Sequence, residues 1–160
     1  MRVLGLDLGA KRIGVAVSDR SGTIASPLCV IQRSKSRAED HRQIARLVAD
    51  EEVEAIVIGL PLTLKGEWGR AAELAKTEAD QLTTVVDVPI MLHDERFTTV
   101  TAQSALMEAR MRADARRRLV DKIAAAVMLQ SWLETQRHQA ERDAATPDHT
   151  TQNDSDGDAL

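Results

Sequence analysis

The stretch that decides the fold is Val3-Leu4-Gly5-Leu6-Asp7-Leu8-Gly9, an apolar run that carries a single carboxylate. An apolar run of this length next to a glycine turn is typical of a buried strand. An ionised carboxylate inside a buried strand is costly unless a cation compensates its charge. We therefore expect a cation at Asp7, and we take this residue as the starting point for the functional site.

Two further carboxylates stand where they could meet the same cation. Glu95 follows an apolar strand pattern that begins at Pro89, and Asp121 opens the apolar face of the last helix that the sequence predicts. The three acids come from three separate elements, and each of them faces a core. This arrangement favours a divalent-metal site over scattered surface charge.

The order of the elements predicts an α/β fold. Strands are expected over residues 3–8, 13–18 and 23–31, separated by turns, which gives an antiparallel meander. The elements expected next are a helix over 36–51, a strand over 53–60, a helix with Ala71, Leu74, Ala75 and Leu82 on one side, a strand over 89–93, a helix containing Ala102, Ala105, Leu106 and Ala109, and a helix over 116–136. Together they predict a mixed five-stranded sheet with helices on both faces.

Length and composition bound the organisation of the chain. A chain of 160 residues builds one core of ordinary size, and we place one domain over residues 1–137. Residues 138–160 are expected to be a disordered acidic tail, because residues 140–160 hold six acids against Arg142 alone. No leader pattern and no apolar run of about 18 residues is present. We therefore expect a cytoplasmic protein without a membrane partner.

Glycines and cations near the acids suggest contact with phosphate. Lys11 and Arg12 follow Asp7 in a glycine-flanked turn, and a glycine-rich loop over residues 59–69 runs into a helix N-terminus. Six cations, among them Arg116, Arg117 and Arg118, lie between Arg110 and Lys122. This basic run is either a solvated helix start or a segment that grips phosphates beside the metal. Trp68 is either a stacking platform or a side chain that packs over its loop.

Four motifs in this order closely resemble the YqgF/RuvX family. They are residues 7–19 (DLGAKRIGVAVSD), residues 59–62 (GLPL) with Gly66 and Gly69, residues 94–99 (DERFTT), and residues 121–130 (DKIAAAVMLQ). The family is the Holliday-junction-resolvase-like or pre-16S rRNA nuclease branch of the RNase H-like superfamily, and the resemblance covers roughly residues 1–134. It implies an RNase H-like fold and a catalytic set that matches Asp7, Glu95 and Asp121. The chain departs from the family pattern at residues 63–65 and 67–68, and a fourth carboxylate is not evident.

The resemblance and the residues together predict a metal-dependent nuclease, a hydrolase that acts on ester bonds in structured nucleic acid. Two Mg²⁺ or Mn²⁺ ions would be held by the three acids, with Asp7 bridging both ions and Glu95 and Asp121 each holding one. Lys11, Arg12 and Arg96 would position phosphates, and Arg116, Arg117 and Arg118 would bind the more distant backbone. The expected substrate is the 5′ end of pre-16S rRNA during ribosome biogenesis, with branched DNA as the alternative. A homodimer is compatible with the sequence.

Two other functions remain open at this point. The stretch Leu6-Asp7-Leu8-Gly9 followed by Gly14 also resembles the phosphate loop of actin-like and sugar-kinase ATPases, although those proteins close a duplicated domain over ATP. The second alternative is a nuclease fold that serves as a non-catalytic RNA-binding assembly factor for the ribosome. Metal-dependent cleavage by the purified protein would separate this alternative from the nuclease.

Overall fold

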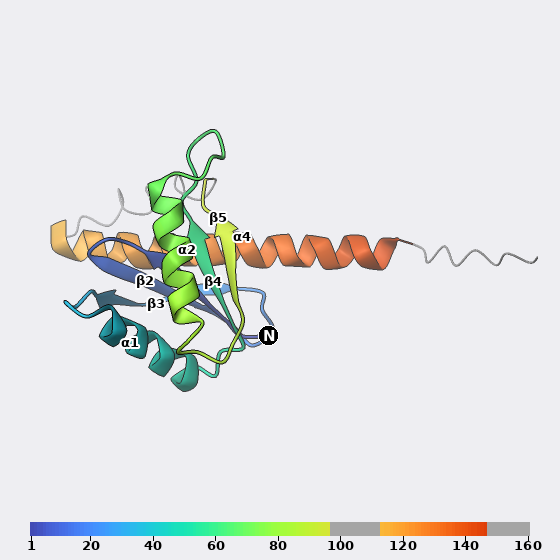
Figure 1. The fold of residues 1–160 in the computed structure, drawn as a ribbon. Coiled ribbons are helices and arrows are strands. Elements are labelled where there is room, and N and C mark those ends of the chain that lie inside the picture. Colours follow the sequence, from blue (N-terminus) through green and yellow to red (C-terminus); the bar gives the residue numbers. More distant parts are fainter. Residues whose placement is uncertain (97–112, 147–160) are drawn as a thin grey trace, which may run out of the picture.

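The sheet has the mixed topology that the sequence predicts. The structure is a computed structural model that describes the backbone of residues 1–96 and 113–146, and the side chains of residues 1–96 and 118–146. The elements are β1 (Val3–Leu8), β2 (Arg12–Ser18), β3 (Ala25–Gln32), α1 (Arg37–Asp50), β4 (Ala55–Leu60), α2 (Arg70–Leu82), β5 (Ile90–Asp94) and α4 (Ala113–Ala145). The five strands lie in the order β3-β2-β1-β4-β5 (Figure 1). β1, β2 and β3 are antiparallel, whereas β4 and β5 run parallel to β1.

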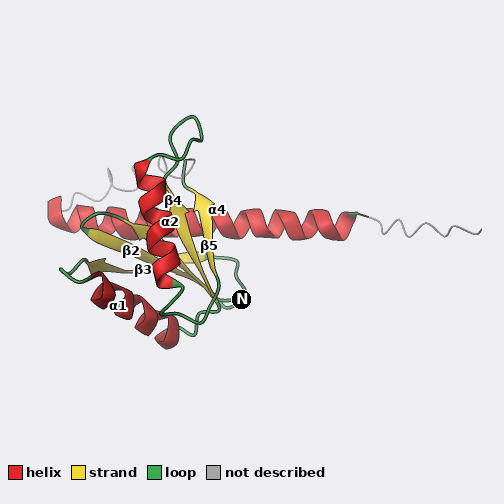
Figure 2. Cartoon of the chain, in the orientation of Figure 1, coloured by secondary structure: helices red, strands yellow, loops and turns green. Residues whose placement is uncertain are grey.

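The helices cover both faces of the sheet. α1 and α2 lie on one face and α4 crosses the other (Figures 1 and 2). Side chains of β1 alternate between the two cores: Leu4 and Leu6 pack with α1 and α2, whereas Val3 packs against α4. Because strand side chains alternate, Asp7 falls on the face of Val3, toward α4. The strand pattern therefore directs the carboxylate to the α4 side of the sheet.

Helix α2 buries two of the four residues that the sequence pattern places on its core side, Ala75 and Leu82. The expected stripe included Ala71 and Leu74, but both are exposed, and 53% of the Leu74 surface is open to solvent. The buried apolar face consists of Ala75 and Leu82 together with Ala72 and Ala79. The prediction was wrong because this face also buries a charged residue, Glu78, which a count of apolar positions does not include.

Helix α4 is longer than expected and corrects the position of the tail. It begins at Ala113 and continues through His138 to Ala145, so the expectation of disorder from residue 138 does not hold for residues 138–145. Its buried contacts end at Leu133, and every residue from Glu134 to Thr146 is exposed. The exposed turns are rich in good helix formers and include a bond from Gln139 to Asp143, four residues along.

Two further expectations concern parts of the chain that are not described. The helix expected to contain Ala102, Ala105, Leu106 and Ala109 lies outside the described residues, and so does the end of the acidic tail beyond residue 146. Among the described helices, none combines the length and the apolar character that a membrane span needs.

Candidate active site

The two strands beside Asp7 carry a glycine next to it. In the antiparallel pair of β1 and β2, Asp7 lies opposite Gly14. In the parallel pair of β1 and β4, Leu6 pairs with Ile58, and the next residues along the two strands are Asp7 and Gly59. A Cβ atom at Gly14 would overlap the backbone carbonyl of Asp121, and one at Gly59 would overlap the side chain of Glu95. The two glycines therefore make the room in which the other acids approach Asp7.

Glu95 reaches this site from the end of β5. Its backbone N–H donates to the carbonyl of Leu60 at 3.3 Å, which continues the pairing of β4 and β5 by one step. Its carboxyl group hydrogen-bonds with that of Asp7 across the space that Gly59 leaves. Two carboxyl groups in direct contact share one proton more readily than they ionise together.

The electrostatics of this pair are unfavourable without a cation. Burial, the adjacent charge of Asp7 and the hydrogen bond to it raise the pKa of Glu95 from 4.5 to about 7. Burial and the charge of Asp121 raise the pKa of Asp7 as well, although its hydrogen bond with Glu95 acts in the opposite direction. Such a pair near neutral pH is typical of functional sites, where a bound cation or a proton relieves the repulsion.

Asp121 completes the group of three acids, but it has a different partner in this structure. Nε of Arg12 donates to Oδ2 of Asp121 at 2.7 Å, and both side chains keep about a quarter of their surface exposed (24% and 25%). Asp121 is still close enough to Asp7 for its charge to raise the pKa of that carboxyl group. Arg12 therefore provides the compensating charge for Asp121, while Asp7 and Glu95 depend on each other.

Carboxylate oxygens are the ligands that Mg²⁺ and Mn²⁺ prefer, so the three acids fit these ions in kind. The two glycines are needed for this donor set, because a Cβ atom at Gly14 would displace the backbone of Asp121 and one at Gly59 would displace the side chain of Glu95. Over residues 1–96 and 118–146, however, no three His, Cys, Asp or Glu side chains are arranged to hold a metal ion as they stand. Asp121 would have to exchange Arg12 for the ion.

Comparison with known proteins now places the chain. A family model described as "RuvX: Holliday junction resolvase" matches residues 1–135. The chain belongs to the RuvX family. A protein of Roseiflexus sp. (strain RS-1), named "Putative pre-16S rRNA nuclease", is 41% identical over 136 residues, which cover 85% of this chain and 96% of that protein. A Rhodococcus opacus (strain B4) protein of the same name is 44% identical over 137 residues, covering 83% of this chain and 77% of its own length.

Solved structures support the RNase H-like fold of this RuvX-family chain. Thermus thermophilus RuvC in complex with a Holliday junction substrate superimposes with a TM-score of 0.55 at 18% identity, covering 86% of this chain and 96% of that one. Fowlpox virus resolvase, solved with Holliday junction DNA, gives 0.51 at 13% identity, covering 85% and 99%. At these identities the likeness concerns the fold alone, and it confirms the fold class that the sequence predicts.

The basic residues expected to bind phosphate divide into three groups. Lys11 is exposed in the turn after Asp7, and Arg12 is bound to Asp121. Arg96 is bound to Asp94 at 2.6 Å, which lowers the pKa of that carboxyl group and makes Asp94 a partner of Arg96. Arg118 is exposed at the start of the described side chains of α4, whereas the side chains of Arg116 and Arg117 lie outside them.

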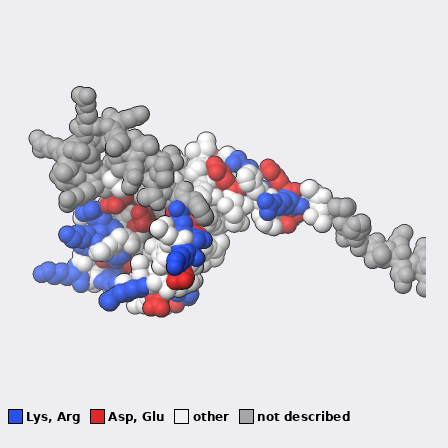
Figure 3. All heavy atoms as spheres, turned by 90° about the horizontal axis from the view of Figure 1, so that it is seen from above, with Lys and Arg blue, Asp and Glu red and all other residues white. Residues whose placement is uncertain are grey.

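The surface near this RuvX-family site is mixed in charge. Figure 3 looks down on the edge of the sheet where β4 and β5 end, and it shows Lys and Arg side chains at the rim with acidic side chains between them. Acidic and basic side chains also alternate along the exposed part of α4. Basic side chains interspersed with acidic ones on this face are consistent with contacts to phosphates beside a bound cation.

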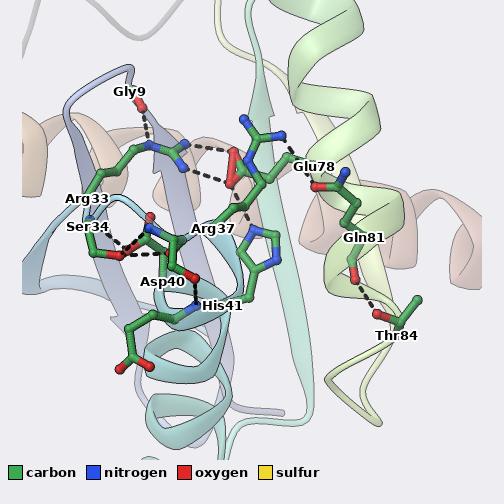
Figure 4. A network of polar contacts seen from close by, with 11 residues as sticks. Gly9, Arg33, Ser34, Arg37, Asp40, His41, Glu78, Gln81 and Thr84 are labelled. Carbon is green, nitrogen blue, oxygen red and sulfur yellow. Dashed lines mark hydrogen bonds and ion pairs between the residues drawn. The ribbon is translucent and has the colours of Figure 1, made fainter.

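Sequence reasoning missed three residues that support the site from the face of the sheet that α1 and α2 cover. Arg33, His41 and Glu78 form a polar cluster on the α1 and α2 face, and the cluster reaches the turn after Asp7 (Figure 4). A signal was available at Glu78, a charged residue on the buried side of a helix whose neighbours at i−3 and i+4 are Ala75 and Leu82. Arg33 had no comparable signal, because it directly follows a strand and could equally point to solvent.

Proposed function

We propose that this chain is a divalent-metal-dependent nuclease that hydrolyses phosphodiester bonds in structured nucleic acid. The observation that carries the proposal is the contact between the carboxyl groups of Asp7 and Glu95, which Gly59 permits, together with the raised pKa of each of these buried groups. Asp7, Glu95 and Asp121 would hold the metal. When bound, the metal supplies activation of the attacking water and stabilisation of the leaving oxygen.

The other residues of the site bind and orient the substrate. Without a metal ion, Arg12 neutralises Asp121. When a cation takes the place of Arg12 beside Asp121, the guanidinium group of Arg12 becomes available to a phosphate. Lys11 follows Asp7 by four residues and Arg96 directly follows Glu95, and both add positive charge near the acids. Arg116, Arg117 and Arg118 would contact the more distant backbone. The few aromatic residues favour recognition of shape and phosphate over stacking on unpaired bases.

The substrate that we propose is the 5′ end of pre-16S rRNA in the cytoplasm. The names of the Roseiflexus and Rhodococcus relatives support this choice. A four-way DNA junction is the second candidate, because the description of the matching family model refers to a Holliday junction resolvase. Cleavage of a pre-16S leader RNA and of a synthetic four-way DNA junction, side by side with Mg²⁺ and with Mn²⁺, separates the two.

The decisive variant is Asp7→Asn. We expect it to abolish cleavage and to keep the fold, because the amide has nearly the same shape and removes a buried charge. Thermal unfolding without metal should give a midpoint equal to or above that of the wild type, and added Mg²⁺ should no longer raise it. Asp87→Asn, at an exposed position, is the matched control and should behave as wild type.

Each other outcome has a clear meaning. Cleavage by Asp7→Asn at the wild-type rate would show that the metal site is elsewhere. Absence of cleavage by the wild type, together with normal 16S 5′ ends in depleted cells rescued by Asp7→Asn, would indicate a non-catalytic RNA-binding factor instead.

A further inference from the structure

One arginine, Arg33, connects the turn between β1 and β2 to helix α2. The Arg33 side chain lies between the Gly9 carbonyl and the carboxylate of Glu78 (Figure 4). Its Nε donates to the Gly9 oxygen at 2.7 Å, and its two terminal nitrogens donate to the two Glu78 oxygens at 2.9 and 2.7 Å. The backbone N–H of Arg33 donates to the Lys11 carbonyl at 3.0 Å. Both ends of the turn are therefore bound to the same residue.

A second set of bonds holds the arginine. Glu78 on α2 also accepts a hydrogen bond from, or shares a proton with, Nε2 of His41 on α1 at 2.9 Å, and both of these side chains are about 95% buried. Burial alone would raise the pKa of Glu78, but the hydrogen bonds from Arg33 and His41 lower it overall. The Arg33 cluster (Arg33, His41 and Glu78) thus connects β3, α1 and α2 through a charged group whose position is fixed by three elements.

The chain of bonds continues to the candidate metal ligand. The N–H of Gly9 donates to the Asp7 carbonyl at 3.1 Å, so the residue whose carbonyl Arg33 binds is itself hydrogen-bonded to the backbone of Asp7. On the other side of the turn stands Arg12, which binds Asp121. The turn therefore sets the positions of the two residues around which the site is built.

On the side that faces α2, the turn borders an open space. A cavity of about 380 Å³ lies between the turn and α2. Its lining includes Gly9 and Ala10 of the turn, the Arg33 side chain, and Ala75 and Glu78 of α2. Because this space is open, the turn lacks close-packed support there, and the guanidinium of Arg33 bridges it. A misplacement of about 1 Å in catalytic groups can cost about a hundredfold in rate.

We propose that Arg33 is a positioning residue, held by Glu78 and His41, that fixes the Gly9–Lys11 turn and through it the geometry of Asp7 and Arg12. The kinetic part of this inference rests on the proposed nuclease function, whereas the structural part does not. Arg33 binds no substrate, and its effect passes through the turn.

The first test substitutes Arg33→Lys. An ammonium group keeps the charge but cannot reach Gly9 and both oxygens of Glu78 in the same fixed fork. We expect hydrogen exchange of the Gly9 amide to rise about tenfold or more, kcat to fall about tenfold or more, and the Kd for uncleaved substrate in Ca²⁺ to stay within about twofold. The matched control is Arg42→Lys on α1, which removes an arginine that donates two hydrogen bonds to one oxygen of Glu39 at the surface and should change none of these quantities.

The second test separates positioning from stability. Buried ion-pair clusters can often be replaced by apolar side chains without loss of stability, so the triple variant Arg33→Met, His41→Leu, Glu78→Leu is expected to keep a thermal midpoint near that of the wild type. It leaves the Gly9 carbonyl unbound, so kcat should stay low and Gly9 exchange should stay fast. Recovery of both kcat and Gly9 protection in this triple variant would overturn the proposal and leave Arg33 a purely structural residue.

The exchange measurement also keeps the two proposals apart. Gly9 protection is read on the protein alone, without metal or substrate. Unchanged Gly9 exchange in Arg33→Lys would overturn the positioning role even if the wild type is an active nuclease. Fast exchange in this variant, together with a wild type that cleaves no nucleic acid, would support the positioning role and contradict the proposed function.

Discussion

At the scale of single residues, the site is built around carboxylates whose charged form is destabilised by burial. Asp7 and Glu95 are in contact and partly removed from water, and burial is the main cause that raises the pKa of each. Arg12 compensates Asp121 in the same neighbourhood. The fold thus accepts an unfavourable carboxylate pair, which a divalent cation would convert into a favourable interaction.

The carboxylate pair predicts how stability depends on pH. The pKa of Glu95 is raised from 4.5 in the unfolded chain to about 7 in the folded state. Between these values the folded state holds more protons, so its contribution to stability is present below pH 4.5 and is lost as the pH rises through 7. The loss is of the order of a few kcal/mol at most, because one pKa unit corresponds to about 1.4 kcal/mol.

Urea unfolding in EDTA at pH 5 and pH 8 measures this loss. Glu95→Gln should unfold with a smaller difference between the two pH values than the wild type, because the amide does not titrate. Glu67→Gln, in the exposed loop, is the control and should keep the wild-type difference. Equal pH dependence in all three proteins would mean that the pair is not coupled as the structure indicates.

At the scale of elements, the approach of α4 to the sheet depends on residues that lack a side chain. Gly5 lies beneath Leu129, and Gly14 lies beneath the backbone of Asp121. The small residues of α4, such as Ala125, complete this close contact. Register matters as much as composition here, because a shift of one residue would place a side chain under the helix and turn Asp7 to the other face.

Substitution of the two glycines tests this contact. Gly5→Ala would place its Cβ atom 2.9 Å from the Cβ of Leu129, so α4 would have to shift slightly, at a cost of about 1–3 kcal/mol, as at other overpacked sites. Gly14→Ala meets a backbone carbonyl, which cannot rotate away, so it should destabilise more and should also reduce cleavage, because Asp121 is displaced. Chemical denaturation and kcat measure the two effects; a smaller loss in Gly14→Ala than in Gly5→Ala would contradict the close approach of Asp121.

At the scale of the whole molecule, the chain separates a packed body from a projecting helix end. Buried contacts of α4 stop at Leu133, and the exposed turns extend away from the sheet in both ribbon views (Figures 1 and 2). The net charge of −4 includes the acidic C-terminal region, so it describes the body poorly. Binding of nucleic acid is expected to depend on Lys11, Arg12 and Arg96 and on the start of α4.

Truncation after Arg137 tests whether the body folds without the projecting end. We expect the free energy of unfolding to change by no more than about 0.5 kcal/mol, since every described residue from 138 to 146 is exposed. The deletion also removes a net charge of −5, so non-specific binding should tighten at low salt and return to the wild-type value near 0.5 M, where the Debye length is only about 4 Å. A large drop in thermal midpoint would show that the end packs on the body.

The basic start of α4 predicts a salt-dependent contribution to binding. Replacement of Arg116, Arg117 and Arg118 with Ala should weaken binding and flatten the dependence of log K on log salt by about 2 to 3 units, if each arginine neutralises one phosphate. The double variant Arg137→Ala, Arg142→Ala, at the other end of the helix, is the control. An unchanged slope in the triple variant would mean that these arginines only face solvent.

From the sequence alone the topology could be predicted, and the three acids could be named as candidates for the site. Apolar periodicity and turn residues are local signals, so they predicted the meander, the parallel strands and the exceptional charge of Asp7. The same signals failed at α2, where Leu74 was expected to be buried but is exposed, and they gave no expectation for Glu78, because a buried carboxylate is stabilised by partners that local sequence does not reveal. They also ended α4 too early, since exposed helical turns lack an apolar stripe.

Only the tertiary structure decided which charges meet. Arg12 and Asp121 are 109 residues apart in the chain, and Arg33 and Glu78 are 45 apart. Both pairs depend on the strand register and on which faces α2 and α4 turn toward the sheet. The spacing of the residues in the sequence specifies neither the register nor these faces. Burial then fixes the energy of each contact, because a carboxylate removed from water must find a cation, a proton or a donor wherever the fold has placed one.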